Sequence, residues 1–371
     1  MTDDVTDDET GVPLMVLRGG TSRGLYLETA DLPADPAARD DLLLRLMGTP
    51  DPRQIDGLGG ATSLTSKVAV VGPSEHPDAD VDYLFLQLGV EEATVSEQQN
   101  CGNILAGVGP FALERGLVAS ADGETDVRIR MVNSDSIAVA TVRTPGGRVS
   151  YRGDVAIAGV PGTAAGITLA FSDTEGSATG ALLPTGNVRD TVDGVEVTCV
   201  DNGMPVVLAL ASSFDLTGHE SHEDLAADAA LAQRVDDLRT KAGALMGLGD
   251  VTGSSVPKTV LLAPPADGGQ VATRSFIPVR PHTAVGVLAA VSVVTGMLLP
   301  GAVGHEIAEA WPRGGTRIDV EHPTGHFLVD VAVDTTASTP RVIRSGVVRT
   351  ARKLMDGTAF PRPAPRAGTE D

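Results

Sequence analysis

Cys101 is one of only two cysteines in a chain of 371 residues, and it stands where an apolar helix is expected to begin. The segment QQNCGNILAGVGPFALERG places Asn100 before this cysteine, with Gly102 and Asn103 after it. Backbone N–H donors and the dipole at a helix start stabilise a thiolate. We therefore expect Cys101 to exchange a proton with a ligand, and Gly102 and Asn103 to leave helix donors facing that ligand.

Cys199 provides the contrast. In VEVTCVD it alternates with Val195 and Val197, and this pattern predicts a small core residue on one face of a strand. Two cysteines so far apart in sequence predict neither a disulfide framework nor a multi-cysteine metal site. A reducing, cytoplasmic location is the corresponding expectation.

Lys67 is the first residue of a predicted apolar strand in GLGGATSLTSKVAVV, and the small residues before it would leave its amine accessible. A lysine at a strand end is commonly a solvated residue that discourages edge pairing. In a cleft, partly desolvated and close to other cations, the same amine could exchange protons near neutral pH. Both interpretations stay open on this residue alone.

The segment RGGTSRG, from Arg18 to Gly24, follows a predicted strand and combines backbone donors, two hydroxyls and two guanidinium groups. Such a set suits a carboxylate or a phosphate. It lacks the Lys-Ser or Lys-Thr of a phosphate-binding loop and is not a GxGxxG segment, so nucleotide binding is not expected. The alternative is a glycine-rich turn with solvated arginines.

Two histidine pairs have spacings that could chelate a metal: His219 with His222, and His322 with His326. Neither pair has a third ligand or an HExxH pattern, so we expect solvated loop histidines and no metal. No GxSxG segment is present, which gives a serine hydrolase little support.

The chain is acidic, with a formal net charge of −21. A surface of that sign repels phosphate backbones and anionic lipid headgroups, so neither nucleic acid nor a membrane is an expected partner. An apolar stretch that begins at Ala284 approaches the length of a membrane span. Gly296 and Pro300 interrupt it, and a buried helix followed by a loop is the better prediction.

Apolar runs of strand length recur along the chain, and several of them alternate as half-buried antiparallel strands do. They begin near Leu14, Lys67, Val81, Val127, Ile137, Val195 and Val256. Helices are fewer, and we expect them at Pro36–Met47, after Cys101, at Leu225–Met246, after His282 and at His305–Trp311. Many strands with few helices indicate an α+β fold.

Two of these helices, after Cys101 and after His282, are apolar on all sides, so each must be surrounded. We expect two similar domains, each a barrel-like layer of strands around a central helix, with both helix starts facing a common cleft. The predicted boundaries are an acidic disordered leader over 1–12, a first domain over 13–190 and a second over 191–339. Residues 340–371 are a candidate completion of the first domain.

Together, several segments resemble the 2-methylaconitate isomerase family of the diaminopimelate-epimerase-like fold, from about Pro13 to about Phe360. They are RGGTSRG, GGATSLTSK, NCGN with GVGPFALERGLV, YRGDVAIAGVPGTAA, VDNGMPVV, MGLGD and PHTAVGVLAAVSV. The resemblance implies an isomerase that shifts a proton in an unsaturated tricarboxylate without metal or organic cofactor. The implied reaction is keto–enol tautomerisation of 4-oxalomesaconate, an intermediate of gallate breakdown, and a homodimer is compatible with it.

The resemblance also implies roles for individual residues, with Lys67 and Cys101 as the acid–base pair. The implied substrate-binding residues are Arg18, Gly19, Gly20, Thr21, Ser22, Ser66, Asn100, Gly102, Asn103, Lys258, Arg280, His282 and Thr283. The second central helix begins with Pro281, His282 and Thr283, without the thiol found in the cysteine-pair epimerases of this fold. This departure weakens a racemase interpretation and leaves the role of His282 open.

Two alternatives to the tautomerase remain. One is cis–trans isomerisation of 2-methylaconitate, which would share the proton removal. The other is a non-catalytic tricarboxylate-binding protein, in which Cys101 and Lys67 would be dispensable. The sequence does not assign which of the two residues is the base, because coupled groups titrate as a pair.

Overall fold

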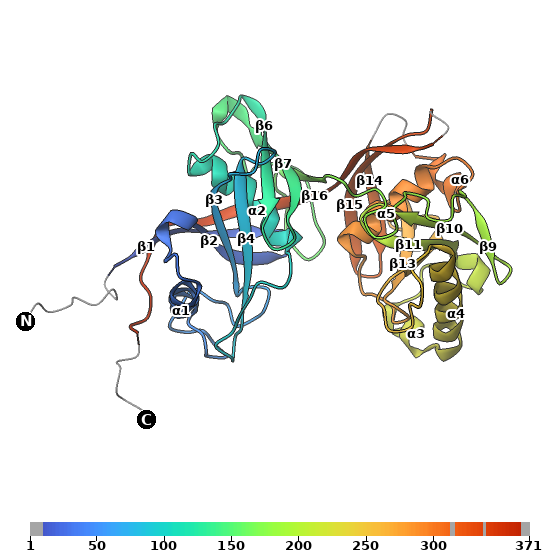
Figure 1. Ribbon diagram of the computed structural model, residues 1–371, viewed down its shortest axis with the longest axis horizontal. Coiled ribbons are helices and arrows are strands. Elements are labelled where there is room, and N and C mark those ends of the chain that lie inside the picture. The colour runs from blue at the N-terminus through green and yellow to red at the C-terminus, as the bar shows by residue number, and fades with distance from the viewer. Residues whose placement is uncertain (1–9, 312–315, 337–338, 365–371) are drawn as a thin grey trace, which may run out of the picture. The chain divides into compact units, whose positions relative to one another are not determined.

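The computed structural model describes residues 10–311, 316–336 and 339–364 (Figure 1). The chain forms two compact units, residues 1–169 with 349–371 and residues 170–348. Of the leader predicted over 1–12, residues 1–9 lie outside the described residues, and Val12 already begins strand β1 (Val12–Gly19). The units divide at 169/170 and 348/349, whereas the predicted divisions are at 190/191 and 339/340. Each observed division lies inside a strand, β8 (Gly166–Phe171) or β16 (Arg341–Ala359), and not in a linker.

Unit 1 is a barrel of strands. Besides β1, β8 and the second part of β16 it contains β2 (Ser22–Glu28), β3 (Lys67–Pro73), β4 (Val81–Leu88), β5 (Val95–Ser96), β6 (Gly123–Met131) and β7 (Ser136–Thr144). The order is β1-β2-β3-β4-β6-β7-β8-β16, and β16 pairs again with β1. That last pairing closes the sheet on itself, so the C-terminal part of the chain completes the N-terminal unit.

Helix α2 (Gly102–Glu114) lies inside this barrel (Figure 1). Every residue from Ile104 to Leu113 is buried, and the helix packs against β1, β2, β3, β4, β6 and β7. Two glycines permit the close approach. A Cβ on Gly107 would lie 2.3 Å from the Tyr26 hydroxyl oxygen, and one on Gly109 would lie 3.0 Å from the Ala140 Cβ.

Helix α1 (Pro36–Met47) covers the outside of the barrel. Its start is fixed by Asp35, whose carboxylate accepts a hydrogen bond from the Ala38 N–H at 2.9 Å, and by Pro36 in the first turn. Gly48 ends the helix in the left-handed conformation, with φ of 79°. The predicted bounds of α1 are confirmed because these local signals fix both ends.

Unit 2 repeats the same pairing pattern. Its strands are β9 (Asp190–Val192), β10 (Val195–Asp201), β11 (Pro205–Leu210), β12 (Lys258–Ala263), β13 (Val271–Phe276), β14 (Arg317–His322), β15 (Gly325–Asp334) and the first part of β16. An antiparallel hairpin, a parallel pair, an antiparallel pair and a parallel pair follow one another from β10 to β14, as they do from β1 to β6. The predicted α+β fold with two similar halves is confirmed.

The central helix of unit 2 is α5 (Val287–Leu298), buried from Ala289 to Met297 and packed against β10, β11 and β15. This confirms the buried helix predicted after His282. In the part of the chain that the structure describes, no helix is long and apolar enough to cross a membrane.

The helix predicted over Leu225–Met246 is wrong in its limits. The structure has α3 (His222–Ala227) and α4 (Ala229–Leu245) instead, because Ser221 and Asp228 each cap a new helix start. The helix predicted over His305–Trp311 is the shorter α6 (His305–Ala308). Within the described residues, short 3-10 turns lie at Thr29–Asp31, Pro145–Gly147 and Ala211–Phe214.

Cys199 of β10 belongs to the apolar core that β10 and α4 share in unit 2, and it has no exposed surface. Burial, with a smaller effect of Asp190, raises the pKa of its thiol to about 12. It is therefore a neutral core residue, as the alternation with Val195 and Val197 predicts.

We predict that Cys199→Ser lowers the free energy of unfolding by about 1–3 kcal/mol, because the new hydroxyl is buried among apolar side chains. Chemical denaturation of variant and parent measures the loss. An unchanged midpoint and slope would contradict the burial argument.

Candidate active site

The Lys67 side chain is buried and held in a defined position at the start of β3. Its Nζ donates a hydrogen bond to Gln87 Oε1 at 2.6 Å and lies 5.1 Å from the centre of the Phe85 ring. The Gln87 amide cannot readily turn over, because its Nε2 donates to the carbonyl oxygens of Ser63, Ser66 and Leu88. The structure therefore positions the amine through Gln87, a residue that the sequence analysis did not identify.

Strand alternation places Lys67 on the inner face of the barrel. On β3, the next residue Val68 belongs to the apolar cluster that packs with Leu43 and Met47 of α1, so Lys67 faces the opposite way. On β2 the inner face carries Tyr26, whose hydroxyl donates to the Ile104 carbonyl of α2 at 2.6 Å. The amine thus shares its side of the sheet with α2.

Cys101 is the N-cap residue of α2 and is half-buried. Its backbone is extended, with φ of −129° and ψ of 100°, and its side chain makes no capping hydrogen bond. The Tyr83 hydroxyl, from the inner face of β4, lies 3.4 Å from the Cys101 carbonyl oxygen. The first N–H groups of α2 have no partner within the helix, so thiol and donors occupy one helix end.

Gly24 connects the amine with this helix end. It pairs with Lys67 across β2 and β3, and a Cβ placed on it would lie 2.8 Å from the Lys67 carbonyl oxygen. The same Cβ would lie 3.0 Å from Ile104 Cδ1, in the first turn of α2 after Cys101. Lys67 and Cys101 therefore lie near the same end of the barrel interior.

The turn between β1 and β2 packs against the start of α2. A Cβ on Gly19 would lie 2.2 Å from the Asn103 carbonyl oxygen, and one on Gly20 would lie 2.0 Å from Asn103 Oδ1. The close contact alone requires glycine at position 19. Position 20 has both the contact and a left-handed φ of 51°, so it requires glycine as well. Asn103 Nδ2 donates to Thr21 Oγ1 at 3.0 Å, which joins turn and helix.

Ser22 adds a hydroxyl to this region. It is 3% exposed, and within the described residues its Oγ has no hydrogen-bond partner. An unpaired buried hydroxyl is costly, and such groups are found where a ligand or a reaction uses them. By alternation it lies on the same face of β2 as Gly24 and Tyr26.

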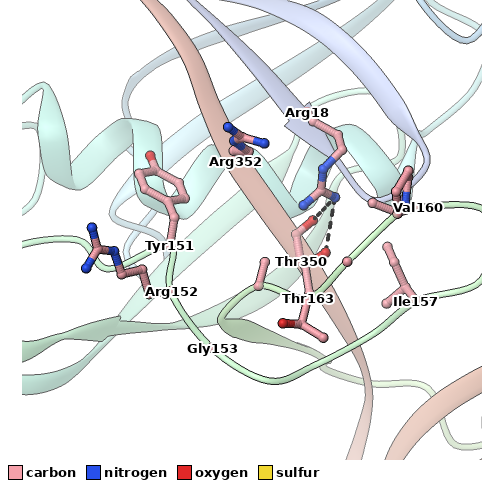
Figure 2. A pocket seen from close by; sticks show the side chains of 12 residues that line it. Arg18, Tyr151, Arg152, Gly153, Ile157, Val160, Thr163, Thr350 and Arg352 are labelled. Atoms are coloured by element: carbon pink, nitrogen blue, oxygen red, sulfur yellow. Dashed lines mark hydrogen bonds between the residues drawn. The ribbon is translucent and has the colours of Figure 1, made fainter.

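Three of the implied site residues have other contacts. Asn100 Nδ2 donates to Ser134 Oγ at 2.7 Å. The buried Ser66 hydroxyl lies 3.0 Å from Gln54 Oε1 and 2.9 Å from the Thr62 carbonyl oxygen, and its single O–H can donate to either. Arg18 extends from the face of β1 opposite to Gly19, where its Nη1 donates to the Thr350 carbonyl and to Thr350 Oγ1 (Figure 2). The same Nη1 also donates to the Gly20 carbonyl.

The remaining implied residues belong to unit 2. Lys258 is the first residue of β12 and pairs in parallel with β11, as Lys67 does with β2 in unit 1. Its Nζ lies 3.4 Å from a Cβ built on Gly286, the N-cap residue of α5, and burial lowers its pKa. Arg280 lies in the exposed turn before His282, and the Thr283 carbonyl accepts from Thr324 Oγ1.

His282 is a neutral imidazole near neutral pH. Burial lowers its pKa most, the contact with the Ala284 N–H opposes this, and the positive charges of Lys258 and His222 lower the pKa as well. Nδ1 accepts a hydrogen bond from the Ala284 N–H at 2.8 Å, which leaves the proton on Nε2. His282 is therefore a hydrogen-bond donor through Nε2.

The expectation of solvated loop histidines is wrong for the second pair. His322 ends β14 and is buried. His326 lies on β15, with Nδ1 3.0 Å from Asp319 Oδ2 and Nε2 3.2 Å from Asp267 Oδ2. Burial opposes protonation, but these two carboxylates raise the pKa of His326 overall. Across the described ranges no group of three or more His, Cys, Asp or Glu residues could hold a metal ion.

Known proteins match this chain over nearly its whole length. Residues 9–361 match the family described as PrpF protein. The chain is 56% identical over 349 residues to a (4E)-oxalomesaconate Delta-isomerase of Novosphingobium sp. (strain KA1), covering 94% of this chain and 97% of the relative. It is 54% identical over 350 residues to a 4-oxalomesaconate tautomerase of Pseudomonas putida, covering 94% and 96%.

A solved structure supports the same assignment. The crystal structure of a methylitaconate-delta-isomerase superposes with a TM-score of 0.85 at 32% identity, and the match covers 98% of this chain and 99% of the other. A family match of this extent, together with relatives above half identity, leaves one conclusion. The chain belongs to the PrpF family.

Proposed function

We propose that this protein is a cofactor-independent isomerase that shifts a proton in an unsaturated tricarboxylate. Its proposed substrate is 4-oxalomesaconate, and its reaction is keto–enol tautomerisation. One arrangement supports the proposal: Gly24 brings the start of β3, which carries Lys67, against the first turn of α2, which Cys101 caps and whose first N–H groups have no partner within the helix. The names of the two relatives above half identity support the choice of substrate.

The reaction needs a base, an acid and donors for a developing negative charge. One of Lys67 and Cys101 removes a proton from the carbon next to the ketone, and the electron pair of that C–H bond moves into the conjugated carbonyl system. The N–H groups of Gly102 and Asn103 stabilise the resulting dienolate. The other residue delivers a proton to the ketone oxygen, which gives the enol, so one C–H bond is replaced by one O–H bond and no electron is gained or lost.

Buried phenols fit this chemistry. Burial and then the nearby Cys101 raise the pKa of Tyr83 well above its ordinary value, and the same causes act on Tyr26. Both therefore stay protonated and donate hydrogen bonds to the first turn of α2. They hold the helix start without competing for the transferred proton.

The proposal includes a reducing, cytoplasmic location, because the role given to Cys101 requires a free thiol. Both cysteines are free. The decisive assay is turnover of 4-oxalomesaconate by the purified protein, followed through the absorbance of the conjugated enol. If only 2-methylaconitate is turned over, that acid and not 4-oxalomesaconate is the substrate. Binding of either acid without turnover would favour a tricarboxylate-binding protein.

We expect Cys101→Ser and Lys67→Ala each to fold and to lose about 100-fold or more in kcat, because each variant removes one member of the acid–base pair. The double variant should lose little more than either single one, since the two residues act as a unit. Steady-state kinetics with melting temperatures measure both effects. Cys199→Ser is the matched control, and parental turnover by folded Cys101→Ser would refute the assignment.

Gln87→Glu should reveal which residue is the base. A carboxylate in contact with the Lys67 amine stabilises the ammonium form, so the limb of the pH–rate profile due to this amine moves to higher pH. Activity at neutral pH then falls if Lys67 is the base and persists to higher pH if Lys67 is the acid. The profile of kcat against pH decides, and an unmoved profile in a folded variant would exclude Lys67 from proton transfer.

Gly19→Ala should lower kcat/KM by about tenfold or more, because its Cβ would force the β1–β2 turn away from Asn103 and the start of α2. Gly357→Ala on β16 is the control, since a Cβ there meets nothing within 4 Å and the position has no positive φ. Equal kinetics for the two variants would show that the turn does not position the site.

A further inference from the structure

A cavity of about 390 Å³ lies in unit 1 between β1, β16 and the loop over residues 151–164 (Figure 2). Three arginines line it, namely Arg18, Arg152 and Arg352, and Thr163 and Thr350 contribute hydroxyls. No residue of its lining is acidic. In a chain with a net charge of −21, this cavity concentrates positive charge against the overall balance, as a site for an anion would.

Arg18 and Arg352 stand directly opposite each other in the antiparallel pairing of β1 with β16. Like charges at such positions repel and destabilise the sheet. Burial lowers the pKa of Arg18, and the charge of Arg352 lowers it further. Among the residues that the structure describes, no carboxylate forms a salt bridge with either arginine, although Lys353 beside Arg352 pairs with Glu114.

The Arg18 guanidinium is fixed on one side and available on the other. Its Nη1 donates to the Gly20 carbonyl at 2.8 Å and to Thr350 O and Oγ1 at 3.1 Å. Nε and Nη2 form no hydrogen bond with any described residue. This edge presents two parallel N–H groups, the geometry that binds a carboxylate or phosphate through two oxygens.

We propose that this cavity binds the carboxylate or phosphate group of a small anion at a site separate from Lys67 and Cys101, so that Arg18 belongs to this site and not to the substrate-binding residues that the resemblance implies. Arg18 supplies the two-donor edge, Arg352 supplies the second positive charge, and the bound anion removes the repulsion between them. Strand geometry supports the separation, although the Arg18 charge still acts on Tyr26 of the inner face. Arg18 extends from one face of β1, whereas Gly19 on the other face contacts Asn103 of α2.

The test is calorimetric titration of the purified protein with two probes, inorganic phosphate and the saturated tricarboxylate tricarballylate. We expect at least one of them to bind the parent, and Arg352→Gln to weaken that binding by about tenfold or more. Arg18→Lys, which keeps the charge but loses the planar edge, should weaken it as well. The probe that responds identifies a phosphate or a carboxylate ligand.

Two further variants distinguish binding in this cavity from general charge attraction and from binding beside Lys67. Arg148→Gln removes the same charge from an exposed position in unit 1 outside the cavity, and it should bind the probe as the parent does. Lys67→Ala should also bind it normally, whatever happens to turnover. Because the measurement is binding, a failure of the proposed isomerase activity leaves this result unaffected.

Three outcomes would overturn the proposal. Neither probe binds the parent at millimolar concentration, or folded Arg352→Gln binds as tightly as the parent. Alternatively, Arg148→Gln or Lys67→Ala weakens binding as much as Arg352→Gln does, which would indicate general charge attraction or a single site shared with the amine. Melting temperatures confirm that each variant is folded.

Discussion

A helix without a polar side must be enclosed, and the architecture of unit 1 follows from enclosing α2. Its residues from Ile104 to Leu113 are all buried, so the strands form a closed barrel around them. The ends of a helix inside a barrel can only open at the ends of the barrel. The unpaired N–H groups and Cys101 therefore meet whatever the ends of neighbouring strands provide, which here is Lys67 at the start of β3.

Strand alternation then divides the polar residues between two surfaces. Inner positions carry Lys67, Gln87 and Tyr83, which hold the amine and the start of α2. On β1 the same rule separates Gly19, which touches α2, from its neighbour Arg18, which reaches the cavity on the other face. Adjacent residues of the RGGTSRG motif thus contact different sites, the start of α2 and the arginine-lined cavity, and the same β1–β2 turn borders both.

The repeated pairing pattern of the two units explains a likeness that the motifs alone do not show. Lys67 begins β3 and pairs in parallel with β2, and Lys258 begins β12 and pairs in parallel with β11, which are the same places in the repeated pattern. The corresponding helix starts differ, with Cys101 capping α2 and Gly286 capping α5. Each unit therefore provides a lysine on the same scaffold, but a thiol accompanies only the lysine of unit 1.

Local patterns of the sequence determined much of this protein: the limits of α1, the buried helices α2 and α5, the core position of Cys199 and the α+β class. These depend on caps and hydrophobic periodicity within a few residues. Only the tertiary structure decided that Gln87 holds the Lys67 amine, that Arg18 faces Arg352, and that β16 closes the barrel of unit 1. Those facts depend on which distant strands pair and in which register. A one-residue shift in register would turn every side chain to the other face, so the sequence pattern of one strand cannot specify its partners.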